Sequence, residues 1–504
     1  FSNRRRNKVA GVILDAQVTP TGASSSCVEM RLYTNENMGN CPKYITVRLL
    51  EFEQRVPQLG SAVLNSEHVV LDDEAREMIS QASTVFLGTR HGERGAVKSG
   101  ADLGLNHRGG PQGFVRVYTE GKDTYVVIPD YSGNRFYQSL GNIQSDCVAG
   151  MVFPNFENGD MLHITGVAEN LFDGAAQRLM PRTALVTRVR VSGFVLVRRS
   201  LNLVLKSAEQ YSPYNPPLRY LASELKAMGK TEHIPSDDRT DGPTAAKLTS
   251  IRRISSTVSA FTFQLDRALE SYLPGSYIIL DFSSVIKVPY MHMNNEMPQL
   301  VNDDLIRTWT ISSVRNEAED TIACTIKLVP GGVISPILHS IDDAKEAGLT
   351  LKVVGSSGEF SCFRTRKVPA KLLWIAGGIG ITPFLAMLEA LARRQVKTDI
   401  VFLFSCRDDD AKLLGEIRTL PPGVELRGVL FASRGQEAAA PKVPGASWSV
   451  HERRMAEPDV KHLADVLERD AFICGPTTLE ALVSRWLLDA GLGEERIHRE
   501  SFTF

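Results

Sequence analysis

Short runs of β-branched and aromatic residues, separated by turn residues, dominate the chain between residues 84 and 191. Six runs stand out: Thr84–Thr89, Gly113–Tyr118, Thr124–Ile128, Val148–Phe153, Met161–Gly166 and Ala184–Val191. This pattern is typical of antiparallel strands in a barrel. A helix is predicted before them over Asp72–Ser83, because Leu71, Ala75, Met78 and Ile79 share one helical face.

The spacing of apolar residues changes twice in the second half of the chain. Residues 247–360 are again rich in strand-forming runs, as in a second antiparallel barrel. From Leu372 onward, apolar strands alternate with helices. Strands are predicted at Leu372–Ala376, Asp399–Ser405, Val424–Phe431 and Ala471–Cys474, and helices at Pro383–Leu391 and Thr477–Leu488. This alternation predicts a parallel sheet covered by helices.

The chain length of 504 residues fits about three domains. A polar, turn-rich linker is predicted over residues 229–245. It separates a first barrel, 65–228, from a second barrel, 246–365, and an α/β domain, 366–504. Residues 1–64 give weak signals and stay unassigned, as does an insertion over residues 283–305. The proline-rich segment Tyr211–Pro217 is predicted to be an extended arm that packs between domains.

Composition narrows the class of protein. The net charge is −1, which argues against a nucleic-acid partner because such proteins carry a basic excess. No apolar run is long enough for a membrane helix. The seven cysteines show no CxxC spacing, so a metal site is not expected, and their odd, dispersed count favours a reducing compartment. We expect a cytoplasmic protein, and a targeting segment upstream of Phe1 remains an open alternative.

The strongest local signal is the segment Ile375–Pro383, Ile-Ala-Gly-Gly-Ile-Gly-Ile-Thr-Pro. It lies where a predicted strand feeds a helix, and its glycines let the backbone approach a pyrophosphate. Phe472-Ile-Cys-Gly-Pro476 ends another strand in the same way. Because parallel sheets bind ligands at the carboxyl ends of their strands, we expect both motifs at one crevice. Cys474 is either a packing residue or a functional thiol of that crevice.

Two further motifs lie upstream. In Arg307-Thr-Trp-Thr-Ile-Ser-Ser313, the guanidinium of Arg307 suits a phosphate, Trp309 suits a flat ring, and Thr310 offers a hydroxyl. An ordinary amphipathic strand is the alternative. In Gly331-Gly-Val-Ile-Ser335, glycine N–H groups and a hydroxyl suit a second phosphate. The alternative is a simple turn into a helix over Pro336–Ile341.

The order RxWT, GGxxS, GGxGxTP and CGP resembles the ferredoxin–NADP reductase superfamily over about residues 246–504. The resemblance implies a flavin-binding barrel followed by a nucleotide-binding domain. It implies that FAD is held by Arg307, Trp309, Thr310, Ser313, Gly331, Gly332 and Ser335. The nicotinamide nucleotide would meet Gly377, Gly378, Gly380, Thr382, Pro383, Gly475 and Pro476. Trp309 stands where the family more often has tyrosine, a tolerable exchange of stacking rings.

The same resemblance supplies the candidate catalytic residues. Cys474 would lie near the nicotinamide and Thr310 near a ring nitrogen of the flavin. The terminal segment Glu500–Phe504 resembles the family's acidic–aromatic end beside the flavin, which adds Glu500 and Phe502.

The donor is predicted to be NADPH. Ser433 and Arg434 follow the third strand of the nucleotide domain, and Arg407 follows the second, so they suit a 2′-phosphate. The carboxylates of Asp408–Asp410 would repel that phosphate if they turned inward.

The first half resembles the pyridoxamine-5′-phosphate-oxidase-like split barrel over about residues 65–200. The residues that carry the resemblance are His107–Val117, Ile128–Arg135, Ser139–Ile143, Gly150–Phe153 and Gly159–Gly166. It implies a homodimer and an FMN site at Arg116, Asn134, Arg135, Ser139 and Asn142. The alternative is a barrel without flavin, in which Gly133-Asn134 is only a turn. No residues that would recognise a B6 substrate are evident.

We therefore expect a multidomain α+β and α/β protein. A split β-barrel would come first, then an antiparallel flavin-binding barrel, then a nucleotide-binding parallel α/β sheet. The predicted activity is transfer of hydride from NAD(P)H to FAD, with electrons passed to FMN or another acceptor. In the alternative, the split barrel is a non-catalytic binding or dimerisation module, and the reductase half serves an external partner.

Overall fold

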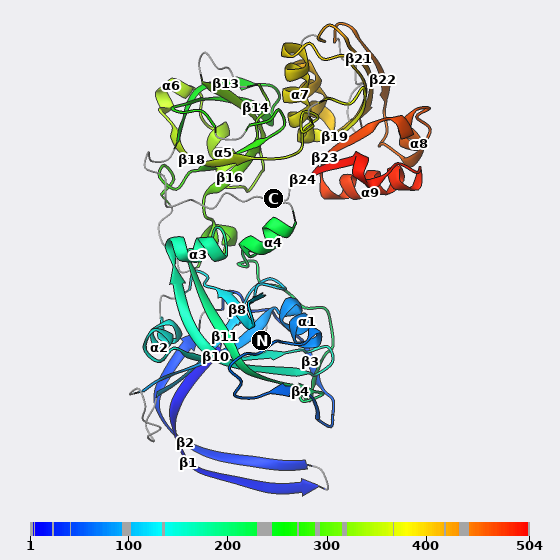
Figure 1. Cartoon of the computed structure of the whole chain (residues 1–504). Helices are drawn as coiled ribbons and strands as arrows, with labels where there is room; N and C mark the ends of the chain where they lie inside the picture. Colours follow the sequence, from blue (N-terminus) through cyan, green and yellow to red (C-terminus); the bar gives the residue numbers. More distant parts are fainter. Residues whose placement is uncertain are drawn as a thin grey trace. The chain divides into compact units, whose positions relative to one another are not determined.

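The computed structural model describes residues 4, 6–22, 25–40, 42–92, 102–133, 137–228, 244–269, 272–287, 293–314, 320–365, 367–417, 420–432 and 443–501. The chain forms two compact units (Figure 1). The first unit contains Phe1–Pro235 and Pro289–Asp303, and the second contains Ser236–Val288 and Asp304–Phe504. The chain thus leaves the second unit after Val288 and returns to it at Asp304. The domain boundaries predicted from the sequence contain no such excursion.

The first unit is built on an antiparallel sheet. Its strands are β4 (Gln58–Val63), β5 (Thr84–His91), β6 (Asp102–Gly109), β7 (Arg116–Glu120), β8 (Asp123–Pro129), β9 (Val148–Pro154), β10 (Met161–Phe172) and β11 (Leu185–Arg198). They pair in the order β6-β5-β9-β10-β11-β8-β7, with β4 also on β11. Five of the six predicted strands are confirmed, and the sixth, predicted over Gly113–Tyr118, begins only at Arg116 as β7. Strand β6 was not predicted because its two glycines and its polar residues break the apolar pattern.

Helices pack on this sheet. They are α1 (Asp73–Gln81), α2 (Gln138–Asp146), α3 (Asp173–Leu179) and α4 (Ala222–Ala227). The predicted helix α1 begins where the Asp72 carboxylate accepts a hydrogen bond from the Ala75 amide at 2.8 Å. Its apolar face, including Ala75 and Ile79, is buried against the sheet.

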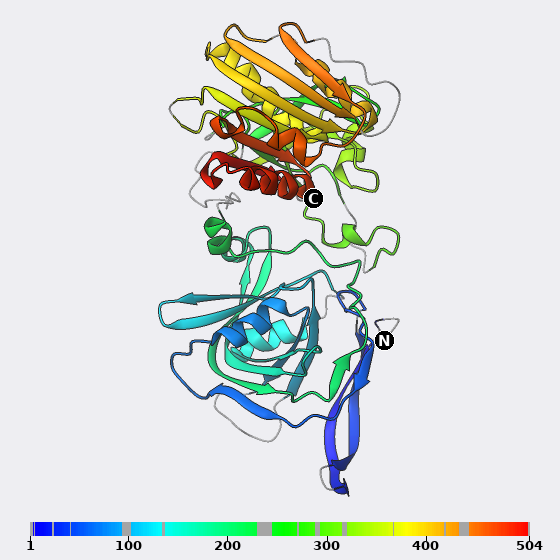
Figure 2. The ribbon, with the colours of Figure 1, turned by 90° about the vertical axis from the view of Figure 1, so that its right-hand side faces the viewer.

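Strands β1 (Arg6–Gly22) and β2 (Ser25–Asn40) form a long antiparallel ribbon, which extends from the body of the first unit (Figure 2). Near its base, the Lys8 ammonium donates to the side-chain oxygens of Asn106 and Gln138. A second small pair joins β3 (Leu50–Phe52) to β12 (Leu203–Leu205). None of these strands was predicted.

The segment 293–303, part of the unassigned insertion, packs in the first unit. It contains the short 3₁₀ helix η1 (Pro298–Asn302). The Asn302 carboxamide accepts from the Ser132 amide at 3.0 Å and donates to the Tyr44 hydroxyl at 2.9 Å and to the Tyr214 carbonyl at 3.2 Å. The Tyr214 hydroxyl donates to the Asn295 side chain at 2.8 Å. The insertion is therefore an integral part of the first unit.

The second unit opens with the predicted barrel. Its strands are β13 (Ala245–Arg253), β14 (Val258–Leu265), β15 (Tyr277–Asp281), β16 (Ile306–Thr310), β17 (Thr321–Lys327) and β18 (Thr350–Ser357), in the order β16-β15-β18-β13-β14-β17. An isolated bridge between Ile311 and Cys324 joins the two end strands, so the sheet closes on itself. Two short helices, α5 (Ile334–His339) and α6 (Ala344–Ala347), follow β17.

The rest of the second unit is the predicted parallel sheet. Strands β19 (Lys371–Gly377), β20 (Thr398–Cys406), β21 (Val424–Ala432), β22 (Ala446–His451), β23 (Asp470–Gly475) and β24 (Ile497–Ser501) pair in the order β22-β21-β20-β19-β23-β24, all parallel. Its helices are α7 (Thr382–Arg393), α8 (Glu457–Lys461) and α9 (Thr477–Asp489), with 3₁₀ turns η2 (Gly378–Ile381), η3 (Asp408–Glu416), η4 (Val466–Glu468) and η5 (Glu494–Arg496). The four predicted strands and both predicted helices are confirmed.

The barrel and the parallel sheet share a hydrophobic core. Val258 and Phe360, from the barrel side, are buried in one cluster with Trp374 and Phe384. Polar contacts reinforce the joint: Arg252 Nη1 donates to Glu416 at 2.7 Å, and the Val314 amide donates to Glu389 at 2.8 Å. This joint explains why the two predicted domains form a single unit.

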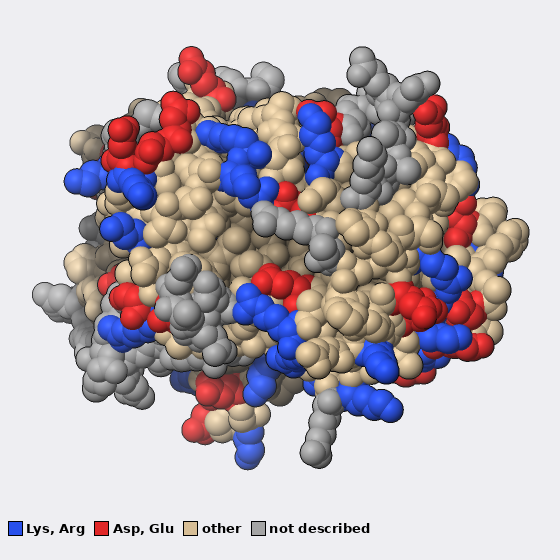
Figure 3. All heavy atoms as spheres, turned by 90° about the horizontal axis from the view of Figure 1, so that it is seen from above, with Lys and Arg blue, Asp and Glu red and all other residues tan. Residues whose placement is uncertain are grey.

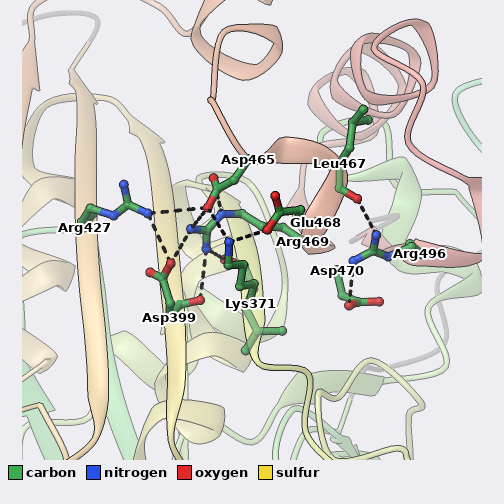
Figure 4. Close-up of polar contacts among 10 residues, drawn as sticks. Lys371, Asp399, Arg427, Asp465, Leu467, Glu468, Arg469, Asp470 and Arg496 are labelled. Atoms are coloured by element: carbon green, nitrogen blue, oxygen red, sulfur yellow. Dashed lines mark hydrogen bonds and ion pairs between the residues drawn. The ribbon is translucent and has the colours of Figure 1, made fainter.

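A charge network ties together the amino-terminal edge of the sheet (Figure 4). The Arg469 side chain is fully buried and lies 2.5 Å from Asp399 and 2.7 Å from Asp465. Asp465 also contacts Lys371 at 3.4 Å, and Lys371 contacts Glu468 at 2.5 Å. The network lies at the start of the strands, so it serves stability rather than the ligand edge at their carboxyl ends.

Candidate functional site

The two glycine motifs meet at the carboxyl edge of the parallel sheet. Strands β19 and β23 are neighbours, with Ala376 opposite Cys474. A Cβ built on Gly377 would lie 2.6 Å from the Leu479 side chain and 2.9 Å from Pro476, and one on Gly380 would lie 2.3 Å from the Cys474 carbonyl oxygen. Glycine is therefore required at both positions for the backbones to approach. The structure brings these motifs together as predicted.

The turn after β19 lies at this edge. Gly378 has φ +53°, and η2 leads directly into α7. The residues that precede them, Gly377 and Ile381, make no side-chain capping hydrogen bond within the described part of the chain. Thr382 is buried and donates to the Ile379 carbonyl at 3.1 Å, and Pro383 is buried at the start of α7. Thr382 and Pro383 therefore shape the turn, in which Gly377 and Gly380 are buried and Gly378 is half-buried.

Cys474 is completely buried at the end of β23. Burial raises the pKa of its thiol well above the ordinary value, and the nearby Glu500 and Glu480 carboxylates raise it further. Glu500 lies directly opposite Cys474 in the register between β23 and β24. Cys474 is thus a neutral thiol beneath the crevice. Phe502 lies outside the described residues.

The RxWT motif lies on β16, where side chains alternate between the two faces. Arg307 and Trp309 pair with the buried Leu280 and Ile278 of β15, whereas Thr310 pairs with Tyr277. The Arg307 guanidinium donates to the Ile306 carbonyl and lies 3.9 Å from Asp304. Trp309 is half-buried and meets Phe282 edge-on, with ring centroids 5.6 Å apart.

Thr310 is buried on the opposite face of β16. The motif therefore offers a cation and a ring on one face and a hydroxyl on the other. Ser313, at its end, is already used within the barrel, because its hydroxyl accepts from the Ala323 amide at 2.9 Å.

The second glycine motif follows β17. Gly331 has φ +76°, and a Cβ added there would meet no atom within 4 Å, so open space lies beside its Cα. Gly332 is tighter, because its Cβ would lie 3.1 Å from the Val329 carbonyl. Ser335 is buried, and its hydroxyl accepts from the Val329 amide at 3.0 Å. Ser335 thus closes the turn, and Gly331 is its accessible part.

Sequence analysis missed an ion pair between these two glycine turns. The Lys327 ammonium, at the end of β17, lies 2.5 Å from the Asp410 carboxylate of η3. Asp410 is buried, and its Oδ2 lies 3.5 Å from the position of a Cβ on Gly378. The predicted repulsion by the Asp408–Asp410 run is therefore neutralised at Asp410. The two residues are far apart in sequence, so only the run of aspartates signalled this position.

The residues predicted to recognise a 2′-phosphate lie only partly within the described chain. Arg407 is exposed directly after β20, at the carboxyl edge. Ser433 and Arg434 lie outside the described residues. Their proposed role stays a prediction.

In the first unit, the described FMN candidates contact other residues of that unit. Arg116, on β7, donates to Glu224 of α4 at 3.0 and 2.5 Å, and its guanidinium lies over the Tyr220 ring. On α2, Ser139 accepts from Asn106, and Asn142 donates to Thr89 at 3.1 Å. Asn134 and Arg135 lie outside the described residues. FMN binding stays a prediction.

We also searched the described residues for a charged patch, a metal-binding cluster and a membrane helix. On the face seen in Figure 3, basic and acidic side chains are interspersed and form no extended basic patch. Within the described ranges, no cluster of His, Cys, Asp or Glu is arranged to hold a metal ion. None of the helices in those ranges is long and apolar enough to cross a membrane.

Comparison with known proteins identifies the same region. Residues 374–485 match the family of oxidoreductase NAD-binding domains. The glycine betaine monooxygenase reductase subunit of Pseudomonas aeruginosa is 27% identical over 249 residues, which cover 49% of this chain and 60% of that protein. The toluate 1,2-dioxygenase electron transfer component of Pseudomonas putida is 23% identical over 268 residues, which cover 51% and 67%. Among solved structures, the FAD/NAD-binding domain of nitric oxide dioxygenase from Vibrio cholerae aligns with a TM-score of 0.37 and 21% identity, covering 52% of this chain and 99% of that one.

The relatives confirm one part of the sequence-based prediction. Residues 374–485 match an oxidoreductase NAD-binding domain, and the two curated relatives are named as a reductase subunit and an electron transfer component of oxygenase systems. The family match supports binding of a nicotinamide nucleotide by this region. The chain spans 60% of the length of the glycine betaine monooxygenase reductase subunit, so the activity of the whole protein is a separate question.

Proposed function

We propose that this protein takes hydride from NAD(P)H onto FAD in its second unit and delivers electrons to a separate acceptor. The observation that carries the proposal is the close meeting of Gly377, Gly380 and Gly475 with the turn at Cys474, inside the region that matches an NAD-binding oxidoreductase domain. Side chains at these positions would collide with atoms of the neighbouring turn, so the glycines allow the two turns to lie together at the carboxyl edge of the sheet.

The residues of the barrel fit FAD. Open space lies beside the Cα of Gly331, and the half-buried Trp309 and the cation of Arg307 lie on the same face of β16. Together they match an aromatic ring system joined to phosphates. When bound, FAD would supply the step from two-electron to one-electron chemistry.

The chain's own residues then have distinct tasks. Arg307 would neutralise phosphate charge, and Gly331 and Gly332 would offer backbone N–H groups. Lys327 is held by the buried Asp410, so a cation is fixed between the two glycine turns. Cys474 and Glu500, paired across β23 and β24, would bound the nicotinamide position, with Phe502 and Thr310 beside the flavin.

The acceptor is proposed to be an external redox protein. The relatives from Pseudomonas aeruginosa and Pseudomonas putida bear the names of a monooxygenase reductase subunit and a dioxygenase electron transfer component. The contacts of Arg116, Ser139 and Asn142 within the first unit further favour this choice. The second candidate acceptor is FMN in a split barrel at residues 65–228, supported by the sequence resemblance. That barrel is also proposed to form a homodimer, and the protein to be cytoplasmic.

Flavin identification separates the two candidates. The full-length protein would be purified, its flavins released by denaturation, and FAD and FMN counted per chain. FAD alone supports the external acceptor, and equal amounts of FAD and FMN support the internal one.

The preferred donor is proposed to be NADPH, held by Ser433 and Arg434 with charge from Arg407. The supporting observation is that Asp410 is paired with Lys327, which removes one source of repulsion. The test is kcat/KM for NADPH and NADH in the wild type and in Arg434→Ala. A wild-type preference for NADH, or an unaltered ratio in the variant, would remove the assignment.

A further inference from the structure

An ion pair joins the barrel to the nucleotide domain between the two glycine turns of the second unit. Lys327 ends β17, shortly before the turn at Gly331, and Asp410 lies in η3, shortly after β20. The Lys327 ammonium donates to the Asp410 carboxylate at 2.5 Å. The Lys327 side chain is 37% exposed, whereas that of Asp410 is only 6% exposed. Water therefore reaches the cation but screens the carboxylate weakly.

The Asp410 carboxylate is held beside the turn that follows β19. A Cβ built on Gly378 would lie 3.5 Å from Asp410 Oδ2. The Asp410 amide donates to the Arg407 carbonyl at 3.1 Å, at the start of η3. Leu413 and Leu414, in the same 3₁₀ segment, are completely buried. The position of Asp410 is thus fixed by its own backbone and by the packing of η3.

Other contacts attach η3 to the barrel without this ion pair. The Ser256 hydroxyl donates to the Asp409 carboxylate at 3.3 Å, and Arg252 Nη1 donates to Glu416 at 2.7 Å. A buried ion pair also adds little net stability, because the cost of taking both charges out of water offsets their attraction. Neither attachment of η3 nor stability therefore requires a charge at Asp410.

We propose that Asp410 sets the affinity of the nucleotide site by cancelling the charge of Lys327. The inference rests on the proposed function, in which the diphosphate of a nicotinamide nucleotide lies at the Gly378 turn. Lys327 alone would place a positive charge near that diphosphate and strengthen its binding. With the Asp410 carboxylate beside it, the pair is neutral and most of this attraction is lost.

A lower affinity suits a site that must release its product after every turnover. The reduced and oxidised nucleotides carry the same diphosphate, so binding energy from that group holds both equally and does not accelerate hydride transfer. Excess affinity would instead delay the departure of the oxidised nucleotide, and product release limits turnover in many enzymes. We therefore expect the charge of Asp410 to shorten the residence of NADP⁺ or NAD⁺ in the site.

Calorimetric titration of NADP⁺ and of NAD⁺ into the full-length, FAD-loaded protein tests this charge balance. Asp410→Asn leaves a net positive charge and should bind both nucleotides about tenfold more tightly. Lys327→Met leaves a net negative charge and should bind both about tenfold more weakly. The double variant is neutral again and should return close to the wild-type affinity.

Asp409→Asn is the matched control. The Asp409 carboxylate contacts Lys412 at 3.0 Å and Ser256, and does not contact Lys327. This variant should therefore keep the wild-type affinity for both nucleotides. If Lys327→Met fails to fold with its buried carboxylate unpaired, the comparison of Asp410→Asn with Asp409→Asn decides the matter.

The possible departures from this order have different meanings. An Asp410→Asn protein that binds no more tightly than the wild type would overturn the inference, as would a double variant that binds no more tightly than Lys327→Met. Tightening for NADP⁺ alone would contradict an action on the diphosphate, which both nucleotides share. A wild type that binds neither nucleotide would refute the proposed function itself, and the inference with it.

Steady-state and stopped-flow kinetics separate a charge effect from a displaced turn. In Asp410→Asn, the inhibition constant of NADP⁺ should fall by about tenfold. The rate constant for flavin reduction at saturating NADPH should stay at the wild-type value, because the affected interaction is the same before and after hydride transfer. Slower flavin reduction would show that the carboxylate positions the turn, and would contradict the proposal.

Discussion

Gly377 and Gly475 face each other on adjacent parallel strands, so closely that a Cβ on Gly475 would lie 3.1 Å from the Cα of Gly377. One glycine ends β19 and the other ends β23. Their contact joins two motifs that are about one hundred residues apart in sequence. The candidate nucleotide site depends on this contact, because it fixes where the backbone N–H groups of both turns lie.

Substitution of Gly380 by alanine tests the geometry of this crevice. The new Cβ would lie 2.3 Å from the Cys474 carbonyl oxygen, so one turn must shift. We expect a loss of about 1–3 kcal/mol in unfolding free energy and at least tenfold weaker NADP⁺ binding by calorimetry. Gly415→Ala is the matched control, because a Cβ there meets nothing within 4 Å. Wild-type nucleotide affinity in Gly380→Ala would show that the turn does not hold the nucleotide.

Arg307→Ala should release FAD. Loss of a charge-assisted hydrogen bond to phosphate costs roughly 1.5–3 kcal/mol, which is about one to two decades in affinity. Equilibrium dialysis of FAD measures the change. Lys247→Ala removes an exposed cation from β13 of the same barrel and should leave affinity unchanged. Equal FAD retention in both variants would refute the assignment of Arg307.

Cys474→Ala should slow flavin reduction by about 10- to 100-fold without releasing FAD, because it alters the wall of the nicotinamide position. Cys324→Ala is the control, since that thiol is equally buried but lies in the barrel core. Stopped-flow reduction at saturating NADPH is the measurement. An unchanged rate constant would make Cys474 a packing residue.

The Cys474 thiol also allows a prediction about the pH dependence of flavin reduction. Its pKa is raised by burial, so it stays protonated between about pH 6 and 9 and should add no pH dependence to the rate. It should also resist iodoacetamide in the folded protein. Rapid alkylation at neutral pH would contradict the buried, neutral state.

Arg469→Met should destabilise the second unit by about 3–5 kcal/mol in urea unfolding, because Asp399 and Asp465 would lose their buried partner. Arg427→Ala is the matched control. Arg427 contacts the same two carboxylates from an exposed position and should cost less than about 1 kcal/mol. Equal losses in both variants would contradict the central role of Arg469.

The ion pair between Arg469 and Asp465 also predicts how the unfolding free energy falls at acidic pH. Hydrogen bonding to Arg469 lowers the pKa of Asp465 from 3.8 to about 2 in the folded state. The folded state therefore holds fewer protons than the unfolded state in this range, and the contribution of Asp465, complete above pH 3.8, is lost as pH falls towards 2. In Arg469→Met this part of the pH dependence should disappear. Unfolding curves measured at several acidic pH values check it.

Sequence patterns predicted the parts of this fold in which burial follows a regular period. The alternation from Leu372 onward, the six strands after Thr84 and the meeting of the two glycine motifs belong to that class, since each depends on local sequence and on the known edge of a parallel sheet. The ribbon of β1 and β2 escaped prediction because its apolar residues are exposed. The Lys327–Asp410 pair and the placement of Asn302 on Tyr44 depend on contacts between distant residues, which no local pattern carries.

Flavin content combined with an anaerobic NADPH titration tests the central claim most directly. Full-length protein would be purified, its flavin identified after denaturation, and the native protein titrated under argon while the flavin absorbance is followed. The account predicts one FAD per chain, bleached completely by NADPH. A protein that neither retains nor takes up FAD, or whose bound FAD is reduced by neither NADPH nor NADH, would contradict it.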